Sequence, residues 1–139
     1  MLSIAGFSLD ILGRESPGSP DYWDGNWLMA NCVCLGQGAR VEVSGSIVRV
    51  DELRLLLDSL KLLYENLAGT ATLQTLEPYL ALTFVAKSRG HFDFTVDITP
   101  DHLAQKHSFI FDLDQTYVRE TIDWLSRILL EYPIWGRPD

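Results

Sequence analysis

The stretch HFDFTVDIT at residues 91–99 decides the fold class of this chain. Its apolar residues occupy every second position, and the residues between them are polar. Successive side chains of a β-strand point to opposite faces, so this alternation predicts a strand with one buried face and one face in water. A sheet with one face exposed to water is typically antiparallel, so the stretch predicts an antiparallel sheet.

Similar patterns occur on both sides of this stretch. We expect about seven strands, at residues 2–12, 27–37, 40–50, 70–76, 79–87, 91–99 and 108–113. Apolar residues at three- and four-residue spacing predict two amphipathic helices, at residues 51–68 and 115–132. The order βββαββββα lacks the strand–helix alternation of parallel sheets. The sequence therefore predicts a single α+β domain over residues 1–139, with one curved, half-barrel-like antiparallel sheet and two helices.

Two irregularities interrupt these patterns. Within residues 2–12 the apolar positions change phase at Gly6, which predicts a β-bulge or a strand that is buried on both faces. Leu55 and Leu62 fall off the apolar stripe of the first helix. Their position predicts that another element covers the outer side of this helix.

The charge balance of the chain favours a basic partner. Among its 139 residues 19 are acidic and 11 are basic, so the formal net charge is −8. Nucleic acid and anionic lipid repel such a chain. No apolar run reaches the roughly 18 residues that a membrane span needs, and the N-terminus lacks the basic start of a secretory signal. We therefore expect no nucleic-acid partner and no membrane partner.

The two cysteines, Cys32 and Cys34, lie one residue apart in a predicted strand. Their side chains should share one face about 7 Å apart along the strand, an arrangement that disulfide geometry does not allow. Free thiols suit a reducing compartment. The sequence therefore predicts a cytoplasmic protein in which both cysteines are small strand residues, with no zinc site.

No motif in the sequence indicates an enzyme or a cofactor site. The chain has no Gly-x-Ser-x-Gly turn for a nucleophilic serine and no glycine-rich phosphate loop. His91, His102 and His107 show none of the spacings typical of metal ligands. We therefore expect no catalytic residue, no cofactor and no metal.

Asp93 and Asp97 are candidates for an acidic face, because both lie on the polar side of one predicted strand. About 13 Å apart along that strand, they are too distant for a glycosidase pair. His91 could pair with Asp93, two residues further on the same side. Asp112 and Asp114 adjoin the start of the second helix, where capping is the common use of an aspartate.

The segment DYWDGNWL at residues 21–28 is the strongest local feature of the sequence. Its candidate residues are Asp21, Tyr22, Trp23, Asp24, Asn26 and Trp27. The favoured interpretation is structural: Trp23 and Trp27 fold onto the domain and lock the preceding loop, because aromatic side chains bury large areas. The alternative is a protein-binding surface, since Trp and Tyr are enriched in interface hot spots.

The same segment resembles the Asp-x-x-Asp-x-Asn-Trp-Leu signature of the small bacterial wall-associated-protein (Wap) immunity family. Three further stretches are similar to that family: Asp51-Glu-Leu53, Leu76-Glu-Pro78 and Leu129-Leu-Glu-Tyr-Pro133. The resemblance implies a cytoplasmic antidote that binds and blocks the C-terminal toxin domain of a secreted toxin. The toxins of the family are commonly nucleases with basic clefts, which the charge of −8 would suit. It implies no individual toxin-contacting residue.

Other functions stay open at this point. The concave face of the predicted sheet could bind a small molecule, and the chain could be a structural or interaction protein or form a homodimer. An unfamiliar enzyme would require clustered Asp and His residues with strongly shifted pKa values.

Overall fold

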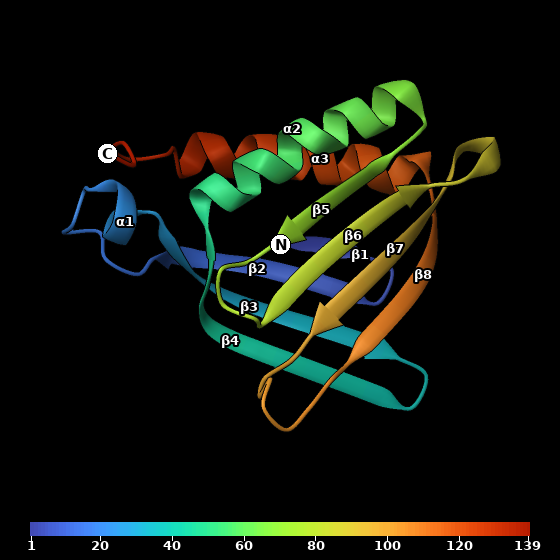
Figure 1. Cartoon of the computed structure of the whole chain (residues 1–139), viewed down its shortest axis with the longest axis horizontal. Coiled ribbons are helices and arrows are strands. Elements are labelled where there is room, and N and C mark those ends of the chain that lie inside the picture. The colour runs from blue at the N-terminus through green and yellow to red at the C-terminus, as the bar shows by residue number, and fades with distance from the viewer.

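The computed structural model describes the whole chain, Met1–Asp139, as two four-stranded antiparallel sheets with three α-helices (Figure 1). The first sheet contains, in spatial order, β1 (Leu2–Ile4), β2 (Phe7–Arg14), β3 (Trp27–Gly36) and β4 (Ala39–Arg49). The second contains β5 (Thr70–Gln74), β6 (Leu80–Ala86), β7 (His91–Ile98) and β8 (Ser108–Asp114). The helices are α1 (Tyr22–Gly25), α2 (Val50–Asn66) and α3 (Gln115–Glu131), and a 3₁₀ turn, η1 (Ser88–Gly90), joins β6 to β7.

The α+β class and the antiparallel pairing are confirmed, but the prediction of one half-barrel-like sheet with about seven strands is wrong. The chain after β4 continues directly into α2, and α2 packs against β5. β4 and β5 therefore do not pair, and eight strands divide into two sheets. The predicted order βββαββββα also lacks α1, a helix of four residues.

The phase change at Gly6 marks a hairpin turn, so the predicted bulge or doubly buried strand is wrong. Ile4 pairs with Phe7, which leaves only Ala5 and Gly6 in the turn between β1 and β2. A Cβ atom on Gly6 would lie 2.1 Å from the carbonyl oxygen of Leu35, a separation that no side chain tolerates. The two apolar phases thus belong to two strands that face the same core.

One core joins the inner faces of both sheets to the buried sides of α2 and α3. The Phe7 ring of β2 meets the Phe94 ring of β7 edge to face, with centroids 6.0 Å apart, and Phe84 stacks on Phe94 at 4.6 Å. Burial of each such side chain contributes about 1.5–3 kcal/mol of hydrophobic stabilisation. The concave surfaces between the layers are therefore filled by side chains.

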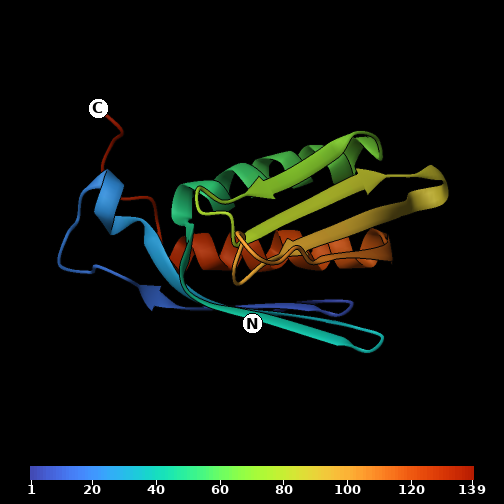
Figure 2. The ribbon, with the colours of Figure 1, turned by 60° about the horizontal axis from the view of Figure 1, so that its bottom comes forward.

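The outer surfaces of the layers stay uncovered. Figure 2 shows the first sheet along one side of the molecule and the second sheet with α2 and α3 on the other. Leu55 and Leu62 on α2 are 69% and 61% exposed, so the prediction that another element covers this side of the helix is wrong. No helix combines the length and the apolar character that a membrane span requires.

Candidate functional site

The segment at residues 21–28 forms α1 and the first residues of β3. The Asp21 carboxylate caps α1 by accepting a hydrogen bond from the backbone N–H of Asp24 at 2.6 Å. The Tyr22 hydroxyl donates to Asp51 Oδ2, which lies 3.1 Å away in the first turn of α2. The carboxylates of Asp21 and Asp51 therefore help to hold this segment in place.

A buried arginine at the end of β4 organises the aromatic residues of the segment. Arg49 is 1% exposed and donates to the carbonyl oxygens of Trp23 at 2.7 Å and Tyr22 at 2.8 Å. Its Nε lies 2.9 Å from Asp51 Oδ1. The ring centroids of Tyr22, Trp23 and Trp27 surround its guanidinium carbon at 5.1, 5.7 and 5.3 Å. Because a buried charge is costly unless it is paired, these contacts form one interdependent unit.

The C-terminal tail closes the other side of the segment. The side chain of Asn26 is fully buried, accepts from the Trp135 N–H at 2.9 Å and donates to the carbonyl oxygens of Trp135 and Tyr22, each at 2.9 Å. Arg14 lies 3.6 Å from the Trp135 ring centroid and donates to the Gly25 carbonyl oxygen at 2.7 Å. Both ribbon views place the C-terminus beside α1 (Figures 1 and 2). We call this unit of α1, Arg14, Asn26, Arg49 and the tail the arginine hub.

The hub leaves part of the segment in water. Asp21 and Asp24 are exposed, and Trp23 is 56% exposed although its ring packs edge to face on Tyr22 at 4.9 Å. Trp27 is half-buried. Trp23 thus holds the hub through its backbone carbonyl, while most of its ring remains available for contact.

Asp93 and Asp97 lie on the outer face of the second sheet, which strand pairing divides into three rows. These rows are Thr70–Val85–Asp93–Asp112, Thr72–Thr83–Thr95–Ile110 and Gln74–Ala81–Asp97–Ser108. None of these twelve residues is basic, and all of them are exposed or half-buried. We call this surface the outer β5–β8 face.

One end of the outer β5–β8 face contains an ion cluster. Lys87 Nζ lies 2.9 Å from Asp93 Oδ1 and 2.9 Å from Asp112 Oδ1, and His91 Nδ1 lies 3.2 Å from Asp112 Oδ2. His91 therefore pairs with Asp112 and not with Asp93, which the sequence offered as a possible partner, because neighbours across paired strands are closer than residues two positions apart on one strand, about 7 Å. Lys87 lowers the pKa of Asp112, and hydrogen bonds to Asp93 and Asp112 raise the pKa of Lys87.

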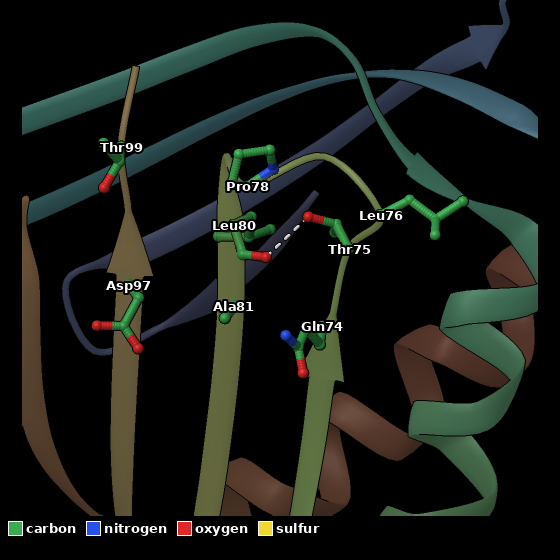
Figure 3. Close-up of a pocket in the computed structure, with 8 residues that line it drawn as sticks. All are labelled: Gln74, Thr75, Leu76, Pro78, Leu80, Ala81, Asp97 and Thr99. Atoms are coloured by element: carbon green, nitrogen blue, oxygen red, sulfur yellow. Dashed lines mark hydrogen bonds between the residues drawn. The ribbon is translucent and has the colours of Figure 1, made fainter. Parts of the chain in front are cut away.

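The other end of the face is hollow. Asp97 forms no ion pair there, and a shallow pocket lies between it, Gln74 and the turn that follows β5 (Figure 3). The floor of the pocket is Ala81, whose small side chain separates Gln74 from Asp97 in the same row. The hydroxyl of Thr75 is already bonded to the Leu80 carbonyl oxygen at 2.9 Å.

Glu52 connects the hub to this pocket. Its carboxylate is buried and accepts from the N–H of Arg49 and from the N–H of Leu76, each at 2.7 Å. Burial raises the pKa of Glu52, and the two N–H donors oppose that shift. Arg49 is the N-cap residue of α2, and the Glu52 side chain satisfies its backbone N–H, as the third helical residue does in a capping box.

Neither the two cysteines nor the possible metal ligands of the chain form a reactive site. Cys32 and Cys34 are free and buried, and burial raises their pKa values to about 12 and about 11, so both thiols stay protonated at neutral pH. No group of three His, Cys, Asp or Glu residues has the geometry of a metal site. Asp114 caps α3 by accepting from the Thr116 N–H at 2.9 Å, as predicted.

Comparison with known families accounts for most of the chain. A family model described as the immunity protein WapI-like family matches residues 1–133. The chain belongs to this family. No curated protein matches the sequence. The family resemblance predicted from the sequence is thus confirmed, and it places the chain among immunity proteins, which are generally not enzymes.

In this WapI-like chain, three residues of the hub were not predicted from the sequence. Arg14 and Arg49 lie at the ends of strands, where composition does not distinguish a buried arginine from an exposed one. Trp135 lies beyond the matched residues and contacts a segment more than one hundred residues earlier. A helpful signal would have been Trp135 itself, because a large aromatic residue near a terminus usually packs on something.

Proposed function

We propose that this chain is an immunity protein that binds a cognate toxin domain and blocks it without catalysis. The observation that carries the proposal is the match of the immunity-family model to residues 1–133. The absence of convergent chemistry supports a role by binding, because blocking a toxin needs only a tight complex over its working surface.

The partner that the charges favour is a toxin domain with a basic surface, such as the cleft of a nuclease, and the complex would form in the cytoplasm. The net charge of −8 attracts such a domain and accelerates association. The exposed carboxylates of Asp21 and Asp24 and the half-buried carboxylate of Asp97 are available for it. A ligand in the concave space has less support, because Phe7, Phe84 and Phe94 fill it.

Co-expression tests the proposal directly. Cells would express the toxin domain encoded upstream of this chain in its genome, alone or together with the chain. We expect growth only with the chain, and a complex of both proteins on gel filtration. Gel filtration of the chain alone gives its own oligomeric state, homodimer included. Toxicity that persists beside the folded chain, or two proteins that elute separately, would overturn the proposal.

A further inference from the structure

The outer β5–β8 face is a broad, uncovered surface whose strands carry no lysine or arginine, and His91 at the start of β7 is their one basic residue. Three of its twelve residues are aspartates, and most of the others are threonine, serine or small residues. Such residues do not protrude far, so a partner can approach the strands closely. In the close-up view α2 lies beside β5, and α3 passes behind it (Figure 3).

The two ends of this face differ in how their carboxylates are used. Asp93 and Asp112 share Lys87 within the chain. Asp97 lies four residues beyond Asp93 on the same strand and side, is half-buried, and has no cation of the chain beside it. A partly desolvated carboxylate gains most from an external cation, because screening by water is reduced there.

The hollow beside Asp97 has the form and chemistry of a seat for a long basic side chain. Pro78 supplies an apolar wall, and the Gln74 amide and the Asp97 carboxylate supply polar groups on the two sides of Ala81 (Figure 3). Lysine and arginine combine an apolar stem with a charged head that donates hydrogen bonds. Ala81 at the floor leaves room for this head between the Gln74 amide and the Asp97 carboxylate.

The rim of the hollow is held in place before any partner arrives. Glu52 of α2 accepts from the Leu76 N–H, and Thr75 Oγ1 donates to the Leu80 carbonyl oxygen. These bonds fix the turn after β5 against α2 and β6. A pre-organised rim loses little conformational entropy on binding, which favours affinity.

From these observations we infer that the outer β5–β8 face docks a basic protein surface and that the hollow at Ala81 takes one lysine or arginine side chain of that surface against Asp97. The inference rests on the proposed function, and the partner is the basic toxin domain. Charge complementarity argues for this occupant, because three carboxylates face outward on this face, and Lys87 and His91 pair only with Asp93 and Asp112.

Matched variants of the two aspartates test the inference. The affinity of an inactivated form of the upstream-encoded toxin domain would be measured by calorimetry for the wild type, Asp97→Asn and Asp93→Asn. We expect Asp97→Asn to weaken binding about tenfold or more and to flatten its salt dependence. Asp93→Asn should change affinity less than about threefold, because Lys87 already neutralises that carboxylate.

A second pair of variants distinguishes binding in the hollow from general electrostatic attraction and from binding at the exposed Trp23 ring of the hub. Ala81→Leu fills the hollow without a change of charge and should weaken binding about tenfold as well. Trp23→Ala should bind as the wild type does. Thermal melts would confirm that each variant is folded.

The possible outcomes are distinct. Binding by the wild type with unchanged affinity for Asp97→Asn and Ala81→Leu would overturn this inference and leave the proposed function intact. Equal losses for Asp97→Asn and Asp93→Asn, or a loss confined to Trp23→Ala, would also overturn it. No binding by the wild type would overturn the proposed function, and this inference with it.

Discussion

The arginine hub and the outer β5–β8 face use the same kinds of residue in opposite ways. In the hub, Arg49 is 1% exposed and its charge is enclosed by carbonyl oxygens, by Asp51 and by three aromatic rings. On the outer β5–β8 face, Lys87 forms solvent-exposed ion pairs with Asp93 and Asp112, and the Asp97 carboxylate has no ion-pair partner. Burial, rather than residue type, therefore separates charges that build the fold from charges that are available to a partner.

The largest effect is expected from Arg49→Met. The substitution leaves the carbonyl oxygen of Trp23 without its side-chain donor, removes one of the two side-chain donors to the Tyr22 carbonyl oxygen, and removes the cationic partner of Asp51. Breaking a buried charge network usually costs about 3–5 kcal/mol, so the free energy of unfolding in urea should fall by about 3 kcal/mol or more. Lys87→Met is the control and should leave the urea midpoint almost unchanged, because its ion pairs are exposed. Equal losses for both variants would erase the distinction between the two regions.

The positions of the strands and long helices were predictable because burial follows a local period. The predicted helices at residues 51–68 and 115–132 match α2 and α3 within two residues at each end, and the strand at residues 91–99 matches β7 within one. Which strands pair is not a local property. Alternation marks the buried side of β4 and of β5 but does not say whether they share a sheet, so one sheet was expected where two exist.

The next largest effect is expected from Asn26→Ala. Its buried amide takes part in four hydrogen bonds within the hub, and the substitution leaves the part-buried N–H and carbonyl oxygen of Trp135 without their partner. An unsatisfied buried polar group costs about 1–3 kcal/mol, and we expect a loss of about 2 kcal/mol. The tail should also become sensitive to limited proteolysis.

Removal of residues 134–139 provides the matching control for Asn26→Ala. If the amide acts by clamping the tail, the two changes together should destabilise the chain by less than the sum of their separate effects. Strict additivity in urea unfolding would show that Asn26 acts independently of the tail.

The sequence allowed us to predict which residues belong to the candidate site, but not what each of them does. Residues 21–28 were selected because aromatic residues cluster there, yet their anchoring depends on Arg49, more than twenty residues later, and on the tail. Asp93 and Asp97 were selected as equals, because both occupy the polar side of one strand. Only the structure distinguishes them, since Lys87 reaches Asp93 across the turn after β6 and does not reach Asp97.

A smaller effect is expected from Trp23→Ala. Arg49 binds the backbone carbonyl of Trp23, which alanine retains, and the ring is 56% exposed. The loss is limited to part of a cation–π contact and some ring packing, about 1 kcal/mol. Trp27→Ala is the matched variant. Loss of the half-buried Trp27 ring should lower the free energy of unfolding by more than loss of the exposed Trp23 ring. A larger loss for Trp23→Ala than for Trp27→Ala would place the anchoring in the exposed ring instead.

The smallest effect concerns the acid range and the Lys87 cluster. Lys87 lowers the pKa of Asp112 in the folded chain. A carboxylate with a lowered pKa contributes stability above its unfolded pKa, near 4, and loses this contribution as the pH falls through its folded pKa. Urea midpoints measured from pH 6 to pH 2 should therefore fall slightly less steeply for Lys87→Met than for the wild type. Because the cluster is exposed, 1 M salt should reduce the difference further. A difference that survives in 1 M salt would mean that this end of the face behaves like the buried hub.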